Sequence, residues 1–168
     1  MLSVYVHGDI NKKIVASVHK LTASLNFIKV VYKMDEADLV VFPLLREILS
    51  PDLFTRNRFG ALVFHPSLLP IHRGGDSIKS AFRKGAYYSG LSWFWLSGGK
   101  VDSGDIAIQS AVKITAQDTP GSYYNDKLIP EAVRTLSVVL NELNRGFVRR
   151  LPQVISNGTF EMVRGDNA

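Results

Sequence analysis

Short apolar runs rich in β-branched residues alternate with helical periodicity, and this alternation restricts the fold more than any other feature. The runs cover residues 2–7, 27–32, 38–42 and 61–64. Residues 11–25 separate the first two runs and place four aliphatic side chains at helical spacing, namely Ile14, Val18, Leu21 and Leu25. A run as continuously apolar as 38–42 suits a strand that is buried on both faces of a parallel sheet. This order of segments predicts an α/β fold with right-handed crossovers.

The second half of the chain continues the alternation. We expect helices over residues 46–56 and 77–85, and strands over residues 90–96 and 105–114. A glycine-rich turn at residues 98–104 separates the last two strands. The predicted fold class is therefore a single Rossmann-like α/β domain, in which helices flank a mostly parallel, twisted sheet.

A long helix is predicted near the end of the chain, over residues 119–144. The residues at its ends are of the usual types, with Asp118 or Thr119 and Pro120 at the start and Gly146 at the end. Pro130 lies inside this helix. Because proline lacks a backbone N–H, Pro130 should kink or divide the helix.

The length of 168 residues corresponds to about one domain. We expect residues 1–168 to form one domain, with a core over residues 1–146 and a tail over residues 147–168 that resembles a linker or a terminal strand. The chain has no cysteine, which excludes disulfides and zinc sites with sulfur ligands. The absence of cysteine and of a signal-peptide pattern favours a cytoplasmic location.

The net charge of +5 favours an anionic ligand. The basic residues are scattered, so a dedicated nucleic-acid surface is not favoured. No stretch approaches the roughly eighteen apolar residues of a membrane span, and no membrane partner is expected. The sequence leaves the oligomeric state open.

Ligands of open α/β sheets bind at the carboxyl ends of the strands, so the candidate site follows residues 42, 64 and 96. His65 comes directly after a strand and directly before Pro66. Asp102 lies in the glycine-rich turn. A carboxylate that faces a histidine can hold it protonated and oriented, and such an imidazolium can stabilise an oxyanion.

Taken alone, each of these residues is also compatible with a structural turn. A metal site on His65 and His72 is poorly supported, because no further histidine or cysteine lies nearby. A serine hydrolase would use Ser67, but the G-x-S-x-G pattern is absent. Walker and dinucleotide-binding glycine patterns are absent as well.

The motifs HPSLLPxxRG, GxSxFW, VDSGDIAIQ and DT follow one another in this order over roughly residues 38–161. Together they resemble the N-terminal formyltransferase domain. This family includes glycinamide ribonucleotide, methionyl-tRNA and sugar N-formyltransferases. The loop around His65 is most similar to that in the hydrolase domain of 10-formyltetrahydrofolate dehydrogenase.

The resemblance implies roles for particular residues. His65 matches the catalytic histidine of the family, and Asp102 matches its catalytic aspartate. Three groups of residues match the folate-binding elements: the pterin-lining segment Arg46, Glu47, Ile48 and Leu49, the apolar wall with Leu69 and Pro70, and the closing turn with Gly98, Gly99 and Gly104. The resemblance therefore implies 10-formyltetrahydrofolate as the formyl donor, no metal, and a small-molecule amine as the acceptor.

The sequence departs from the family pattern at two points. Formyltransferases usually have an asparagine two positions before the histidine, where this chain has Val63. About one β-α unit is also missing from the N-terminal half, which often helps to hold the acceptor. The identity of the acceptor therefore stays open. Hydrolysis of the same folate and folate binding without catalysis are the two alternative functions.

Overall fold

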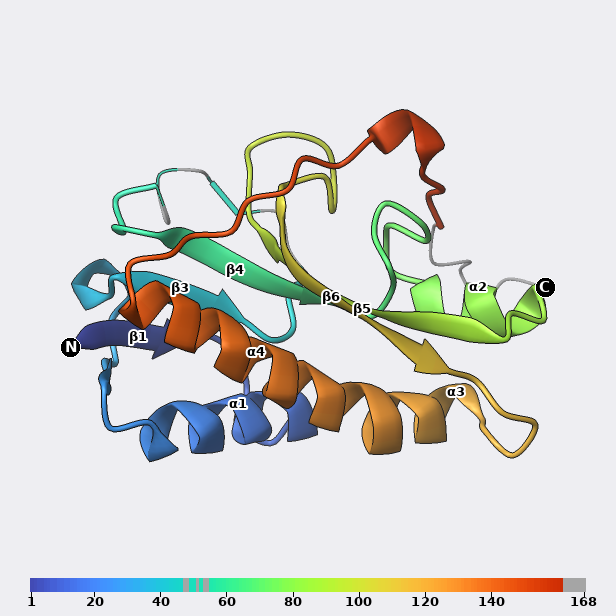
Figure 1. Cartoon of the computed structure of the whole chain (residues 1–168), viewed down its shortest axis with the longest axis horizontal. Helices are drawn as coiled ribbons and strands as arrows, with labels where there is room; N and C mark the ends of the chain where they lie inside the picture. Colours follow the sequence, from blue (N-terminus) through green and yellow to red (C-terminus); the bar gives the residue numbers. More distant parts are fainter. Residues whose placement is uncertain (47–48, 51, 53–54, 162–168) are drawn as a thin grey trace.

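Six strands form one sheet in the computed structural model, which describes residues 1–46, 49–50, 52 and 55–161 (Figure 1). Their order across the sheet is β2-β1-β3-β4-β5-β6. In sequence order the strands are β1 (Leu2–Val6), β2 (Ile28–Val30), β3 (Leu39–Phe42), β4 (Gly60–His65), β5 (Tyr88–Trp95) and β6 (Ile106–Lys113). The single, mostly parallel sheet predicted from the alternation is confirmed.

The direction of β5 differs from the expectation of a parallel sheet. The first four strands pair in parallel, but β5 is antiparallel to both β4 and β6. Leu62 is paired with Trp95 and His65 with Ser92. The carboxyl end of β5 therefore does not lie beside the carboxyl end of β4, and the loop after residue 96 leaves from the other end of the sheet.

Helices cover one face of the sheet. Helices α1 (Lys13–Ser24) and α4 (Ile129–Asn144) lie side by side on this face, whereas the segment after α4 returns along the opposite side (Figure 1). Leu62 and Phe64 of β4 belong to the apolar cluster under the helices. Because side chains alternate along a strand, Val63 and His65 point to the other face, where the candidate site lies.

The long helix near the C-terminus is divided, as Pro130 predicts. Thr119 caps a first turn, α3 (Pro120–Ser122), with a reciprocal capping box. A π-helical segment, η3 (Tyr123–Leu128), connects this turn to α4, and Pro130 is in the first turn of α4. A proline is tolerated there because the first N–H groups of an α-helix have no partner within that helix.

The remaining elements are short: η1 (Met34–Glu36), α2 (Ser77–Arg83) and η4 (Ile155–Asn157). The helix expected over residues 46–56 falls partly on residues 47, 48, 51, 53 and 54, which are outside the described residues, and the described Arg46, Leu49 and Ser50 are not helical. Across the described ranges, no helix combines the length and apolar character that a membrane crossing requires. The tail pairs with the body of the domain, because Leu151 bridges to Ile106 and Phe160 to Arg73.

Candidate functional site

His65 is the last residue of β4 and is only 6% exposed. Its position at the carboxyl end of a parallel strand agrees with the expectation from the sequence, although the histidine belongs to the strand itself. Val63 precedes it on the same face and is buried among apolar side chains that include Phe42 and Phe94. The polar histidine is therefore held at the edge of an apolar surface.

The loop between β5 and β6 brings Asp102 to His65. The loop begins beside Ala61, whose carbonyl accepts a hydrogen bond from the backbone N–H of Leu96. Asp102 itself has a left-handed backbone, with φ of 52°. Gly104 is buried, and a Cβ atom there would overlap the carbonyl oxygen of Trp95. A glycine at this position therefore lets the loop lie tightly against β5.

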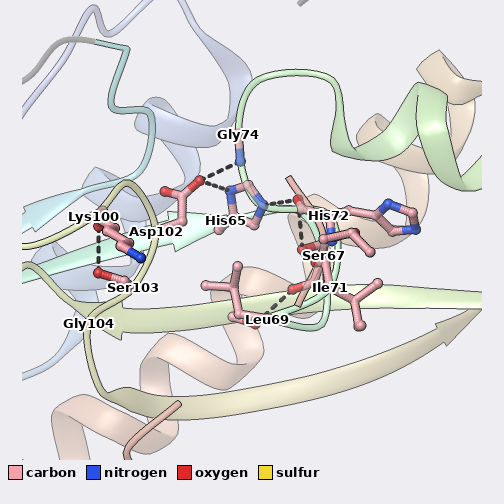
Figure 2. Close-up of polar contacts among 12 residues, drawn as sticks. His65, Ser67, Leu69, Ile71, His72, Gly74, Lys100, Asp102, Ser103 and Gly104 are labelled. Carbon is pink, nitrogen blue, oxygen red and sulfur yellow. Dashed lines mark hydrogen bonds and ion pairs between the residues drawn. The ribbon is translucent and has the colours of Figure 1, made fainter. Parts of the chain in front are cut away.

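Figure 2 shows the His65 ring between two polar groups. Its Nδ1 lies 3.5 Å from Oδ2 of Asp102, and its Nε2 lies 2.8 Å from the carbonyl oxygen of His72. The backbone N–H of Gly74 donates to the same Oδ2 atom at 2.8 Å. Because a carbonyl oxygen can only accept, Nε2 carries a hydrogen. The atom of His65 that can gain or lose a proton is therefore Nδ1, on the side of Asp102.

Burial lowers the pKa of His65 below its ordinary value of 6.5. The Asp102 carboxylate and the His72 carbonyl act in the opposite direction, but their effect is smaller. The effect expected of Asp102 is present, because its carboxylate raises the pKa of His65, but burial of the ring lowers that pKa by more. Burial thus favours a neutral ring that can accept a proton at Nδ1, whereas the protonated His65 stays a prediction from the sequence.

A polar network around the buried Ser92 supports the loop after β4. The hydroxyl of Ser92 donates to the carbonyl of Ser67 and accepts from the backbone N–H of Leu69. Gln109, which is opposite Ser92 on β6, donates to that hydroxyl and to the Leu69 carbonyl. We did not predict a role for these residues, although Ser92 and Gln109 both occur in the family-like motifs.

Several of the residues expected to bind folate gather on the face that His65 shares. Leu69 belongs to the apolar cluster around Val63, and Leu49 packs against that cluster. A cavity of about 230 Å³ has Leu69 and Pro70 in its wall. A second cavity, of about 280 Å³, is lined by Ala61 and Leu96 together with residues of the segment that precedes β4.

The other expected folate-binding residues are less closely associated with this face. Gly98 and Gly99 are exposed and line neither cavity. Arg46 is exposed, and its positive charge partly offsets the rise in the pKa of Tyr124 that burial causes. Glu47 and Ile48 are outside the described residues. Within the described part of the chain, no group of three or more His, Asp or Glu side chains could hold a metal ion.

Comparison with known sequences identifies relatives. The model of the formyl transferase family matches residues 12–139. The cytosolic 10-formyltetrahydrofolate dehydrogenase of Homo sapiens is 31% identical over 133 residues, which is 79% of this chain and 15% of that protein. The chain thus spans about a seventh of the length of this relative.

Comparison with solved structures gives the same fold. HypX from Aquifex aeolicus in complex with tetrahydrofolic acid superposes with a TM-score of 0.81 at 17% identity, covering 98% of this chain and 30% of that one. Phosphoribosylglycinamide formyltransferase from Anaplasma phagocytophilum superposes with a TM-score of 0.75 at 16% identity, covering 97% and 99% of the two chains. At these identities the likeness concerns the fold alone.

Proposed function

The chain belongs to the formyl transferase family, and from this premise we propose that it transfers the formyl group of 10-formyltetrahydrofolate to a small-molecule amine. The observation that carries the proposal is the pair of buried His65 and half-buried Asp102, placed at the carboxyl end of β4 beside an apolar cluster. A folate donor also agrees with the names of a curated relative and of a structural neighbour.

The apolar face suits the flat ring system of the donor. Leu49 packs at the edge of the apolar cluster, and Leu69 and Pro70 line the cavity of about 230 Å³, so these side chains can contact an aromatic ring. Ala61 and Leu96 line the second cavity. Ala61 is four residues before His65 on β4, so the two residues are about 13 Å apart along the extended strand. A donor whose ring occupied that end would extend its formyl group toward His65. Gly98, Gly99 and Gly104 belong to the turn that would close over the ring.

The His65–Asp102 pair supplies the proton transfers of the reaction. The amine nitrogen attacks the formyl carbon, a new C–N bond forms, and negative charge develops on the formyl oxygen. Asp102 relays the proton of the amine to Nδ1 of His65, which is neutral at the start because burial lowers its pKa. The bond between the formyl carbon and N10 then breaks, and His65 donates the proton that came from the amine to N10.

The imidazolium that forms during the reaction also stabilises the oxyanion. A charge in a buried site is less screened than a charge in water, so it acts strongly on a developing charge nearby. In this account His65 becomes protonated during the attack on the formyl carbon, at the moment when the negative charge appears.

Hydrolysis of the same folate is the second candidate, with water in place of the amine. Two observations favour it. Val63 occupies the position at which formyltransferases usually have an oxyanion donor, and the curated relatives include several 10-formyltetrahydrofolate dehydrogenases. The chemistry at the His65–Asp102 pair would be unchanged, because a water molecule loses its proton along the same route.

The fate of the formyl carbon distinguishes the candidates. The donor, labelled with ¹³C in its formyl group, is incubated with the protein and a pool of small amines, and the products are identified by mass spectrometry and NMR. A ¹³C-formylated amine supports transfer, whereas ¹³C-formate without any formylated amine supports hydrolysis. Binding of the donor without consumption would overturn the catalytic proposal.

A further inference from the structure

The tail segment Gly158–Glu161 packs on the loop that contacts both members of the His65–Asp102 pair. We propose that Thr159 and Glu161 are positioning residues, which hold residues 72–74 so that His65 and Asp102 keep their mutual orientation. The consequence for turnover rests on the proposed function, but the orientation of the His65 ring can be measured independently of it.

The loop touches the pair from two sides through its backbone. The carbonyl of His72 accepts the hydrogen of His65 Nε2, and the N–H of Gly74 donates to Asp102 Oδ2. Both contacts are 2.8 Å long. Any shift of this short loop therefore changes the geometry at both catalytic side chains.

The tail pairs with the same loop like a short parallel strand. The N–H of Arg73 donates to the carbonyl of Thr159, and the N–H of Glu161 donates to the carbonyl of Arg73. Gly74 has a positive φ of 92°, and a Cβ atom there would overlap the carbonyl oxygen of Glu161. The tail thus lies against the loop too closely for a larger residue at position 74.

Two side chains of the tail hold His72 itself. Thr159 Oγ1 accepts from the backbone N–H of His72 at 2.8 Å, and Glu161 Oε1 lies 2.9 Å from the Nδ1 atom of its ring. Lys84 donates to the same carboxylate oxygen. His72 has a left-handed backbone with φ of 55°, which is uncommon for a residue with a side chain. The contacts from Thr159 and Glu161 hold this backbone conformation and so keep the His72 carbonyl directed toward His65.

The position of the His72 carbonyl determines which nitrogen of His65 carries the hydrogen. With the His72 carbonyl in place, the hydrogen stays on Nε2 and Nδ1 is free to accept a proton beside Asp102. Without it, the neutral ring can instead place its hydrogen on Nδ1 and donate to the carboxylate. That tautomer cannot accept a proton at Nδ1.

The test uses two matched pairs of variants of the full chain. Glu161→Ala and Thr159→Val remove the contacts to His72, whereas Glu161→Gln and Thr159→Ser keep an acceptor oxygen. Thr115→Val is the control, because it removes a threonine hydroxyl that donates to Asp118 at the far end of β6. The tautomer of His65 is read from ¹⁵N-histidine NMR, and its signal is assigned with a His65→Gln variant. The kcat, the KM and the pH profile of formyl release are measured alongside.

We expect the Nε2–H tautomer alone in the wild type, in both conservative variants and in the control. Glu161→Ala and Thr159→Val should populate the Nδ1–H tautomer and lower kcat about tenfold, with a KM that changes less than about twofold. The acid limb of their pH profile should also shift. Thr159→Val is the milder change and keeps the test decisive if Glu161→Ala does not fold.

An unchanged tautomer in folded Thr159→Val would overturn the proposal, and so would an equal loss of kcat in the Thr115→Val control. If the wild type released no formyl group, the proposed function would fail. The NMR comparison would still decide whether the tail positions His65.

Discussion

The Nδ1 atom of His65 lies 3.5 Å from Oδ2 of Asp102, and one short loop contacts both residues, at Nε2 of His65 and at the same Oδ2 of Asp102. This arrangement makes the pair asymmetric. Nε2 of His65 is committed to a carbonyl group, so proton exchange is confined to Nδ1 and the carboxylate. Burial lowers the pKa of His65, and the loop fixes which nitrogen of the ring exchanges a proton, so both determine the chemistry of the pair.

The lowered pKa of His65 predicts a loss of stability at mildly acidic pH. In the unfolded chain His65 takes up a proton near pH 6.5, whereas the folded protein resists protonation until a lower pH. Between these two pKa values the unfolded state binds more protons, so the free energy of unfolding falls as the pH falls. The slope from this one group is at most about 1.4 kcal/mol per pH unit.

Urea unfolding of wild type and His65→Gln at pH 7.5 and at pH 5.5 checks this sign. The wild type should lose more stability than the variant between the two values. Equal losses in the two proteins would show that burial does not govern the protonation of His65. The same shift places the acid limb of the kcat/KM profile below pH 6.5, because the neutral ring of the free protein is the form that accepts the proton.

Replacing Val63 with asparagine tests whether the site is built around an aliphatic residue. Val63 is 3% exposed and packs with Phe94 and Leu69, so an amide would be buried among apolar groups. We expect a loss of about 1–3 kcal/mol in the free energy of unfolding and no gain in kcat. Val40→Asn is the matched control, because Val40 belongs to the same apolar cluster on the neighbouring strand β3. A tenfold rise in kcat for Val63→Asn would show that a missing oxyanion donor limits the reaction.

Gly104→Ala should disturb the loop that carries Asp102. The added Cβ would overlap the carbonyl oxygen of Trp95, and a backbone atom cannot move aside cheaply. The variant should lose about 1–3 kcal/mol of stability and most of its turnover. Gly121→Ala serves as the control, since its added Cβ has no atom closer than 3.9 Å. Melting temperatures and formyl release are compared, and a fully active Gly104→Ala would contradict the described packing of the loop.

Much of this site is predictable from the sequence, because continuous motifs carry it. The apolar run before His65 predicts a buried strand, and the following Pro66 and the glycines around Asp102 predict loops. The direction of β5 is not predictable in the same way, since the residues of GLSWFWL would be buried in a parallel or an antiparallel strand. Its direction depends on the path of the chain through residues 66–87.

The role of the tail is also beyond the reach of local patterns. His72 and Glu161 are 89 residues apart in the sequence, and no periodicity connects them. The net direction of the His65 pKa shift is hidden for a related reason, because a nearby carboxylate and deep burial act in opposite directions. Only the folded arrangement shows that burial has the larger effect.

Reduced folate should bind without a metal. The expected pocket uses apolar contacts, and the described residues contain no group of three or more side chains that could hold an ion. Calorimetry with 5-formyltetrahydrofolate should give the same dissociation constant with and without EDTA. Undetectable binding at millimolar folate would overturn the proposed function, although the fold would be unaffected.

A double-mutant cycle on His65 and Asp102 shows whether these two residues act as one unit. Formyl release from 10-formyltetrahydrofolate is measured for wild type, His65→Ala, Asp102→Ala and the double variant, with folding checked by circular dichroism. Each single variant should lose at least about 10²-fold in kcat, and the double variant should be within a few-fold of the slower single one. Full activity in Asp102→Ala, or losses that multiply in the double variant, would show that His65 and Asp102 do not act as one unit.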